Sequence, residues 1–223
     1  MNKIINPTEN ILDSIYQELI KYPFTFEEII DVVLRTQTQI NESLDPSKNL
    51  YYYYICPMKE GSDIGGCYEN GIRHRFNLMG KIIFTEGEHN SGKDLDHPEF
   101  GTEIKTRQNL QFNNTNDNGR THDSTKYIDG KDDEESYYIL VQQNFDTNKF
   151  PYTTTVKKIF FGMLSKKDFT NPNGTGAAYL KADIRNMKCI EIWNNEIGNT
   201  IETYQGYLDQ DYYDHESELI NNI

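Results

Sequence analysis

The sequence predicts an α/β (α+β) fold in which helices flank a central mixed β-sheet. Apolar residues recur at helical spacing in the first 45 residues, and short β-branched or aromatic runs separated by turn residues follow them. The composition agrees, because 36% hydrophobic and 26% charged residues are typical of a folded protein with a polar surface. A length of 223 residues predicts about one domain.

Two helices are expected before residue 46. Ile11, Ile15 and Leu19 stand four residues apart and predict the first helix. Thr25 and Glu28 have the spacing of a capping box and predict the start of the second. The apolar face of that second helix would consist of Ile29, Val32, Val33 and Ile40.

The strands of the sheet are predicted from runs rich in β-branched and aromatic residues. These runs are Tyr51–Cys56, Lys81–Thr85, Thr102–Thr106, Tyr137–Gln143, Lys157–Leu164 and Cys189–Trp193. A third helix is predicted over Gly65–Met79, although glycine is unfavourable inside a helix. The polar stretches Asn113–Ser136 and Asn171–Gly176 are predicted to be loops.

The chemistry is predicted to lie in the segment that leads into the third of these strands. It reads Asp96-His97-Pro98-Glu99-Phe100-Gly101-Thr102-Glu103-Ile104-Lys105-Thr106. On a strand, Glu103 and Lys105 project to one face while Ile104 points to the other. A turn at Pro98 and Gly101 is expected to bring Asp96 beside Glu103, so that two carboxylates face one lysine.

Two carboxylates beside a lysine suit metal-dependent hydrolysis of phosphodiester bonds. Carboxylate oxygens are the ligands that magnesium prefers, and a cationic group can orient the attacking water and stabilise developing charge. Taken alone, the spacing is equally consistent with Glu103 and Lys105 forming a solvated ion pair on an edge strand. A zinc site is not indicated, because the cysteines and histidines lack the usual ligand spacing.

The pattern Asp96-x-Pro98-Glu99-x-Gly101-x-Glu103-Ile104-Lys105-Thr106 resembles the active-site segment of the MutH/Sau3AI-like DNA endonucleases. That group belongs to the PD-(D/E)xK nuclease superfamily, so the resemblance implies a restriction-endonuclease-like fold. It also implies Mg²⁺ bound by Asp96, Glu103 and the Ile104 carbonyl, with Lys105 as the catalytic lysine. The group carries a further glutamate on a helix upstream, for which Glu69, Glu86 and Glu88 all remain open.

The resemblance implies a magnesium-dependent, site-specific endonuclease that cleaves double-stranded DNA, most closely a type II restriction endonuclease. A mismatch-repair nicking endonuclease is the alternative within the same class. One site per chain would require a homodimer or two successive nicks for a double-strand break. From a different class, a non-catalytic nucleic-acid or protein-binding module remains open, in which the charged trio is structural.

The distribution of charge permits a DNA-binding surface despite a formal net charge of −13. Residues 151–190 carry seven basic and two acidic side chains, whereas residues 191–223 carry eight acidic side chains and no lysine or arginine. We expect the DNA contacts to come from Arg107, Lys166, Lys167, Lys181, Arg185 and Asn186. Tyr179 is added because Tyr179-Leu180-Lys181 resembles a stretch that contributes to DNA reading in the mismatch-repair member of the family.

The expected organisation is a single nuclease domain over residues 1–223. Its parts are a helical N-terminal part (1–45), a catalytic and DNA-binding core (80–195) and an acidic tail (196–223). The sequence shows neither an apolar run long enough for a membrane helix nor a secretion signal, so no membrane partner and a cytoplasmic location are expected.

Overall fold

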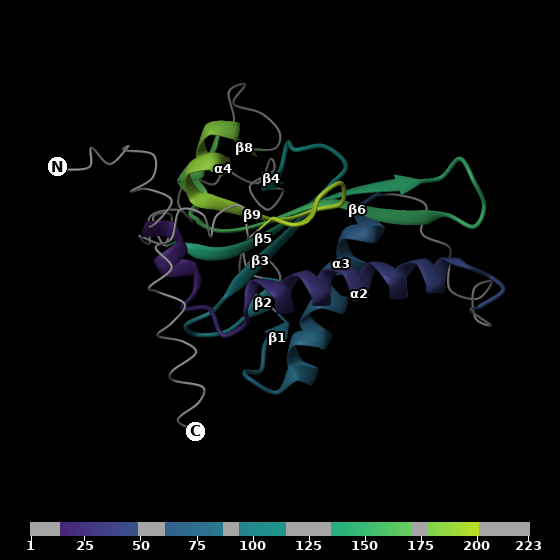
Figure 1. The fold of residues 1–223 in the computed structure, drawn as a ribbon, viewed down its shortest axis with the longest axis horizontal. Helices are drawn as coiled ribbons and strands as arrows, with labels where there is room; N and C mark the ends of the chain where they lie inside the picture. The colour runs from purple at the N-terminus through teal and green to yellow at the C-terminus, as the bar shows by residue number, and fades with distance from the viewer. Residues whose placement is uncertain (1–13, 49–60, 87–93, 115–134, 171–177, 201–223) are drawn as a thin grey trace, which may run out of the picture.

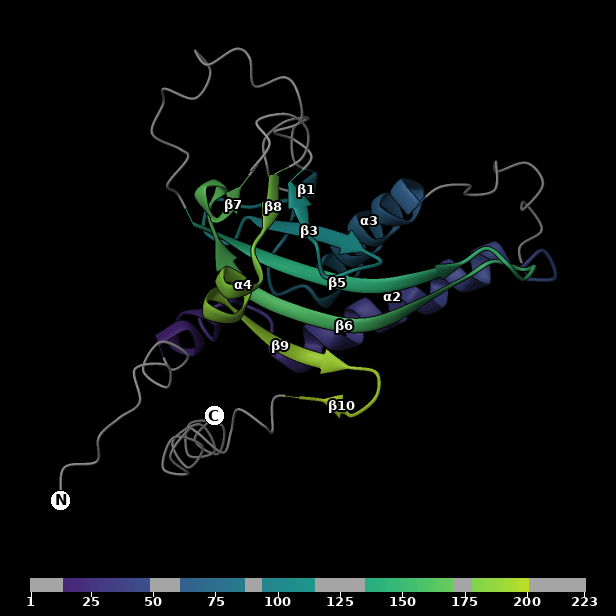
Figure 2. The ribbon, with the colours of Figure 1, turned by 90° about the horizontal axis from the view of Figure 1, so that it is seen from above.

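The structure is a computed structural model that describes residues 14–48, 61–86, 94–114, 135–170 and 178–200. Within these ranges a seven-stranded sheet has the strand order β1-β2-β3-β5-β6-β9-β10, and a three-stranded sheet has the order β4-β8-β7. Helices flank the larger sheet (Figures 1 and 2). The predicted α+β class, with a mixed sheet between helices, is therefore confirmed.

The long helices precede the strands along the chain. The helices are α2 (Phe26–Leu44), α3 (Gly61–Met79) and α4 (Ala182–Lys188), and residues 14–19 are also helical. The larger sheet contains β1 (Thr85–Glu86), β2 (Leu95–Asp96), β3 (Thr102–Arg107), β5 (Ser136–Asp146), β6 (Thr153–Leu164), β9 (Cys189–Asn194) and β10 (Gly198–Asn199). The smaller sheet contains β4 (Asn113–Asn114), β7 (Phe169–Thr170) and β8 (Ala178–Leu180), and the short helix η4 (Lys166–Asp168) precedes β7.

Helix α2 begins where the capping box predicts it. The Glu28 amide donates to the Thr25 hydroxyl over 3.3 Å, and the Glu28 carboxylate accepts from the Thr25 amide over 2.8 Å. Its predicted apolar face is buried, with Ile29 and Val33 fully inaccessible to solvent. Burial of this face, more than helical propensity, holds the helix on the sheet.

The two faces of the larger sheet are covered by different elements. One face carries Ile104, Ile139, Val141 and Phe161 into a core shared with α2 and α3. The opposite face carries Tyr138, Leu140 and Phe160 into a second core beneath the small sheet and α4. Figure 1 shows α2 and α3 below the sheet, with β4, β8 and α4 above it.

The pairing of β3 with β5 is parallel, while the other pairings in the larger sheet are antiparallel. Parallel neighbours require a long connection between their ends. Residues 108–135 make this connection, and its first part carries β4 into the small sheet. The connection therefore takes the chain to the face of the sheet opposite α2 and α3.

One predicted strand is largely absent. In the segment Lys81–Thr85, only Thr85 enters a strand, because the backbone of Phe84 is bonded elsewhere. The Asn77 side chain, in α3, accepts from the Phe84 amide and donates to the Phe84 carbonyl, each over 2.8 Å. The predicted strand Tyr51–Cys56, the loop Asn171–Gly176 and the tail beyond residue 200 lie outside the described residues.

Helix α4, the small sheet and β10 were not predicted from the sequence. The other predicted strands and the third helix are confirmed, with ends that differ by a few residues. Within the described ranges, no helix is long and apolar enough to cross a membrane.

Candidate active site

Strand β3 places Glu103 and Lys105 on one face of the sheet, as their spacing predicts. The strand lies between β2 and β5, and Glu103 and Lys105 are only 1% and 7% exposed. The Lys105 ammonium donates a hydrogen bond to Glu103 Oε1. Ile104 points to the opposite face and is buried among the residues beneath α2 and α3. The pair is therefore buried and is not a solvated ion pair on an exposed edge.

The acid opposite Glu103 is Asp94 and not Asp96. Strands β2 and β3 are antiparallel with Leu95 opposite Thr102, so the preceding residue, Asp94, faces Glu103. Asp94 Oδ2 accepts a hydrogen bond of 2.7 Å from the Ile104 amide. The expectation that the turn would bring Asp96 beside Glu103 therefore differs from the structure.

Asp96 lies beside the turn instead. It is exposed, and its strand partner is Thr85 in β1. His97 closes the turn, because its Nδ1 accepts from the amides of Glu99 and Phe100, both over 3.2 Å. This tight turn fixes the register of β2 against β3 and so determines which aspartate faces Glu103.

Helix α3 packs beside β3 and contributes a third carboxylate, that of Glu69, to the group around Lys105. At Gly65 the helix lies so close to the strand that an added Cβ would be 3.1 Å from Thr106 Oγ1. Glu69 follows one helical turn later, on the same side of α3. Its carboxylate interacts electrostatically with Asp94, Lys105 and Arg107. Of the three glutamates left open by the sequence, Glu86 is exposed in β1 and Glu88 lies outside the described residues.

Glu69, Asp94 and Glu103 all have raised pKa values. The pKa of Glu103 is raised to about 7, mainly by burial and also by the Asp94 and Glu69 carboxylates, while Lys105 opposes the rise. Burial and the Asp94 carboxylate likewise raise the pKa of Glu69 to about 7. Burial also raises the pKa of Asp94 against the opposing effect of Lys105 and the Ile104 amide. One lysine therefore does not offset the cost of burying three carboxylates.

Glu103 has one oxygen left without a partner. Oε1 accepts from Lys105, but Oε2 is buried and has no hydrogen-bond partner among the described residues. A buried acceptor without a partner is costly unless something else binds it. A cation at this position would both satisfy the oxygen and reduce the repulsion among the acids.

The backbone carbonyl of Ile104 lies on the same side of β3 as Asp94. A strand residue directs its amide and its carbonyl to the same side, and the Ile104 amide is bonded to Asp94. The Ile104 carbonyl, implied as a metal ligand by the resemblance, therefore faces the Asp94 side of β3. In this structure the acids are neighbours without converging on one point: the described residues contain no group of three or more His, Cys, Asp or Glu side chains arranged to hold a metal ion.

Two arginines border the acidic cluster. Arg73 follows Glu69 by one turn of α3, and its guanidinium donates to the Asn70 side chain over 2.7 Å and to the Asp94 carbonyl over 3.5 Å. Arg107 ends β3, and burial lowers its pKa while Tyr179 and Glu69 oppose that effect. Together they supply positive charge on either side of the carboxylates.

The residues predicted to contact DNA lie on β3, η4 and β8 and in or just before α4. Tyr179 in β8 is 43% exposed and lies in the electrostatic neighbourhood of Arg107. Lys167, Lys181 and Asn186 are exposed, on η4, before α4 and on α4. The side chain of Lys166 lies outside the described part of the chain.

Arg185 has a role that its sequence position did not predict. Its guanidinium lies over the Phe160 ring, 5.2 Å from the centroid, and donates to the Leu110 carbonyl over 3.2 Å. These contacts join α4 to the larger sheet and to the segment that follows β3. Arg185 therefore helps to hold α4 against the larger sheet.

Sequence reasoning missed Asp94 and Arg73 and left Glu69 undecided. The sequence indicates Asp94 only through the segment Asp94-Leu95-Asp96, because two acids two residues apart share one face of a strand and either could face Glu103. The pairing of Leu95 with Thr102 places Asp94, and not Asp96, opposite Glu103. No protein-family model matches this chain, and a comparison with curated protein sequences finds no match.

Proposed function

We propose that this protein is a magnesium-dependent endonuclease that hydrolyses phosphodiester bonds of double-stranded DNA. The observation that carries the proposal is the cluster of Glu69, Asp94 and Glu103 around Lys105, in which Glu103 is buried and its Oε2 has no partner among the described residues. The resemblance of residues 96–106 to MutH/Sau3AI-like endonucleases supports the same reaction. In this proposal Asp94 takes the role of Asp96, because Asp94 faces Glu103, and Glu69 is the further acid.

The donor set fits magnesium. Three carboxylates and the Ile104 carbonyl are hard oxygen donors, which Mg²⁺ prefers. Glu103 would bind through Oε2, because Oε1 is held by Lys105. When bound, Mg²⁺ supplies positive charge that offsets the charge developing on the scissile phosphate.

The protein's own residues position the reactants. Lys105 is held rigidly by Glu103 on a buried strand, so its ammonium can orient the attacking water and offset charge on the phosphate. Arg107, at the end of the same strand, is placed to hold a neighbouring phosphate of the DNA backbone. Glu69 and Asp94 reach the cluster from separate elements, so α3 and β2 must both be in place for activity.

Within this class we favour a type II restriction endonuclease that leaves a 5′-phosphate and a 3′-hydroxyl, as the resemblance implies. A mismatch-repair nicking endonuclease is the alternative. A double-strand break would need a homodimer or two successive nicks. The non-catalytic binding module is the rival from another class, and in it the same residues would form only a structural charge cluster.

The test is cleavage of unmethylated phage DNA and supercoiled plasmid in Mg²⁺ or EDTA. The parent protein is compared with Lys105→Ala and Asp94→Asn. We expect discrete Mg²⁺-dependent fragments from the parent and none from either variant. Nicked circles alone would favour the nicking endonuclease. If the parent cleaves nothing at concentrations well above those of the DNA, with magnesium or manganese, the endonuclease proposal is wrong.

A further inference from the structure

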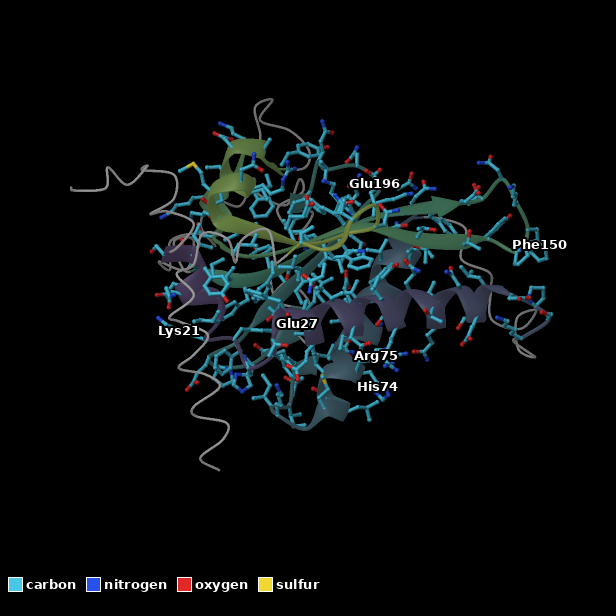
Figure 3. The ribbon with its side chains drawn as sticks, in the orientation of Figure 1. Lys21, Glu27, His74, Arg75, Phe150 and Glu196 are labelled. Atoms are coloured by element: carbon cyan, nitrogen blue, oxygen red, sulfur yellow. The ribbon has the colours of Figure 1, made fainter. Side chains whose placement is uncertain are left out.

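The hairpin formed by β5 and β6 extends well beyond the strands beside it. The pairing of β5 with β6 begins where Ser136 lies opposite Leu164 and ends where Asp146 lies opposite Thr153. On either side, however, β3 ends opposite Gln142 and β9 ends opposite Lys158. The outer hairpin therefore projects from the body of the sheet (Figure 1), and Phe150 lies at its tip (Figure 3).

The two faces of this outer hairpin differ. One face is buried: Phe145 and Val156 pack into the core, and Asn41 of α2 bonds the Thr154 carbonyl and amide over 2.9 Å and 2.7 Å. The opposite face carries Asn144 paired with Thr155, and both side chains are exposed. In the part of the chain that the structure describes, no helix or strand lies over this face (Figure 2).

The exposed face belongs to the same side of the sheet as Glu103 and Lys105. Lys105 is paired with Leu140 on the neighbouring strand. Because side chains alternate along a strand, Leu140, Gln142 and Asn144 share one face. Asn144 lies four residues beyond Leu140, which is about 13 Å along the strand. Lys105 and Leu140 are buried and Gln142 is half-buried, so this side of the sheet becomes exposed to solvent at Asn144, on the hairpin.

We propose that the exposed face of the outer hairpin, defined by Asn144, Thr153 and Thr155, binds the major groove of double-stranded DNA and selects its sequence. This inference rests on the proposed nuclease function. A two-stranded β-ribbon fits the major groove, and asparagine and threonine side chains hydrogen-bond base edges there. Lys157, at the bulge, and Lys149, near the tip, supply positive charge close to this face. The face also carries the half-buried Asp146 opposite Thr153, whose carboxylate accepts from the Asn148 amide over 2.8 Å.

The chemistry of the face favours DNA over a protein partner. Protein interfaces concentrate aromatic and large apolar side chains at their centres. Here such a residue, Phe150, stands at the tip and not among Asn144, Thr153 and Thr155. Short amide and hydroxyl side chains on a projecting ribbon instead match the donors and acceptors of base edges.

The test compares the parent with Asn144→Ala/Thr155→Ala. A matched control, Thr38→Ala/Ser43→Ala, removes two exposed hydroxyl groups from α2, on the other side of the sheet. Sites are first located by sequencing the ends that the parent produces from phage DNA. Cleavage rates are then measured on short duplexes that carry this site or single-base changes in it, and melting temperatures show that each variant is folded.

We expect the hairpin variant to keep Mg²⁺-dependent cleavage but to lose about tenfold or more of the preference for the cognate site. The control should match the parent. Asn144→Asp, which preserves size and adds a charge facing DNA, should weaken binding of the cognate duplex at least as strongly.

If the hairpin variants keep the parent's site preference and affinity, the inference is wrong and the nuclease proposal stands. If the parent cleaves no DNA, the proposed function fails and the inference fails with it. If sedimentation shows that the parent is a dimer without DNA and that the hairpin variant is a monomer, the face binds a second copy of the chain, which also overturns the inference.

Discussion

The two carboxylate oxygens of Glu103 have different surroundings. Oε1 accepts from Lys105, while Oε2 is buried and without a partner in the described structure. A ligand that binds only the folded protein stabilises it by RT ln(1 + [L]/Kd). With Mg²⁺ at a hundred times its Kd, we expect the melting temperature to rise by about 5–10 °C.

Differential scanning fluorimetry in Mg²⁺ and in EDTA measures this shift. Glu103→Gln serves as the comparison, because its neutral side chain should remove most of the response. The same rise in both proteins would show that the ion binds elsewhere.

The two aspartates that flank Leu95 provide a matched pair. Asp94 faces Glu103 and bonds the Ile104 amide, whereas Asp96 is exposed. Asp94→Asn preserves shape and an oxygen for that amide but removes a charge from the cluster. We expect its cleavage rate to fall by about 100-fold or more, while Asp96→Asn stays within about threefold of the parent. Plasmid cleavage rates decide between them, and the opposite order would restore the role that the sequence assigned to Asp96.

The further acid is tested by another pair of glutamates. Glu69 interacts with Asp94 and Lys105, whereas Glu86 is exposed in β1 and lies 3.5 Å from Arg73. We expect Glu69→Gln to raise the Mg²⁺ concentration that gives half-maximal cleavage by about 10- to 100-fold. Glu86→Gln should leave that concentration unchanged. A metal titration of the cleavage rate measures both, and equal effects would exclude Glu69 as the further acid.

The site could be predicted from sequence only where it depends on local spacing. Glu103 and Lys105 share a face because they are two residues apart on a strand, which needs no knowledge of the fold. Which aspartate faces Glu103 depends on the register of β2 against β3, which the turn between them sets. A shift of this register by two residues would have placed Asp96 opposite Glu103. Glu69 depends on how a helix packs against a strand, which no spacing along the chain reveals.

Helix α3 is held close to β3 by a glycine. A Cβ at Gly65 would lie 3.1 Å from Thr106 Oγ1, while a Cβ at the neighbouring Gly66 would meet nothing within 4 Å. Gly66→Ala should therefore raise the free energy of unfolding by about 0.5–1 kcal/mol through helical propensity. Gly65→Ala should raise it less or lower it, and should slow cleavage by moving Glu69.

Urea unfolding and cleavage rates of the two variants measure these effects. Equal gains in stability with unchanged cleavage would show that α3 can move away from β3 without affecting the site.

Elements with a strong local signal were predicted well, and short elements held by distant partners were not. Helix α2 has a capping box and an apolar face, and β5 has a long run of β-branched and aromatic residues. Helix α4 has only seven residues and no buried residue in its own right, so it depends on contacts such as Arg185 with Phe160. The segment before β1 has β propensity but does not form a strand, because the Asn77 side chain bonds the amide and the carbonyl of Phe84.

At the scale of the whole molecule, buried tyrosines connect the helical layer to the sheet. The Tyr22 hydroxyl bonds Thr102 Oγ1 over 2.8 Å, and the Tyr68 hydroxyl bonds Thr154 Oγ1 over 3.3 Å. Burial raises the pKa of both phenols above the usual value of 10.0. The folded protein therefore holds these protons to higher pH than the unfolded chain does.

Because both pKa values are higher in the folded protein than in the unfolded chain, we expect the protein to lose stability at alkaline pH. A tyrosine whose pKa is higher in the folded protein than in the unfolded chain contributes its full stabilisation at pH values below the pKa of the unfolded chain. This stabilisation is lost as the pH rises from that pKa toward the pKa of the folded protein. Above pH 10, the free energy of unfolding should fall by up to about 1.4 kcal/mol per pH unit for each tyrosine. Urea unfolding between pH 9 and pH 11 measures the slope. Tyr22→Phe/Tyr68→Phe should reduce it, and an unchanged slope would assign alkaline unfolding to other groups.

The parallel pairing of β3 with β5 also determines when the acidic cluster can form during synthesis. Glu69, Asp94, Glu103 and Lys105 all precede residue 106, but the strand that supports β3 runs from residue 136 to residue 146. A chain leaving the ribosome therefore carries all four side chains long before β3 has its neighbour. For a protein that cleaves DNA, this order would delay activity until most of the chain had been made.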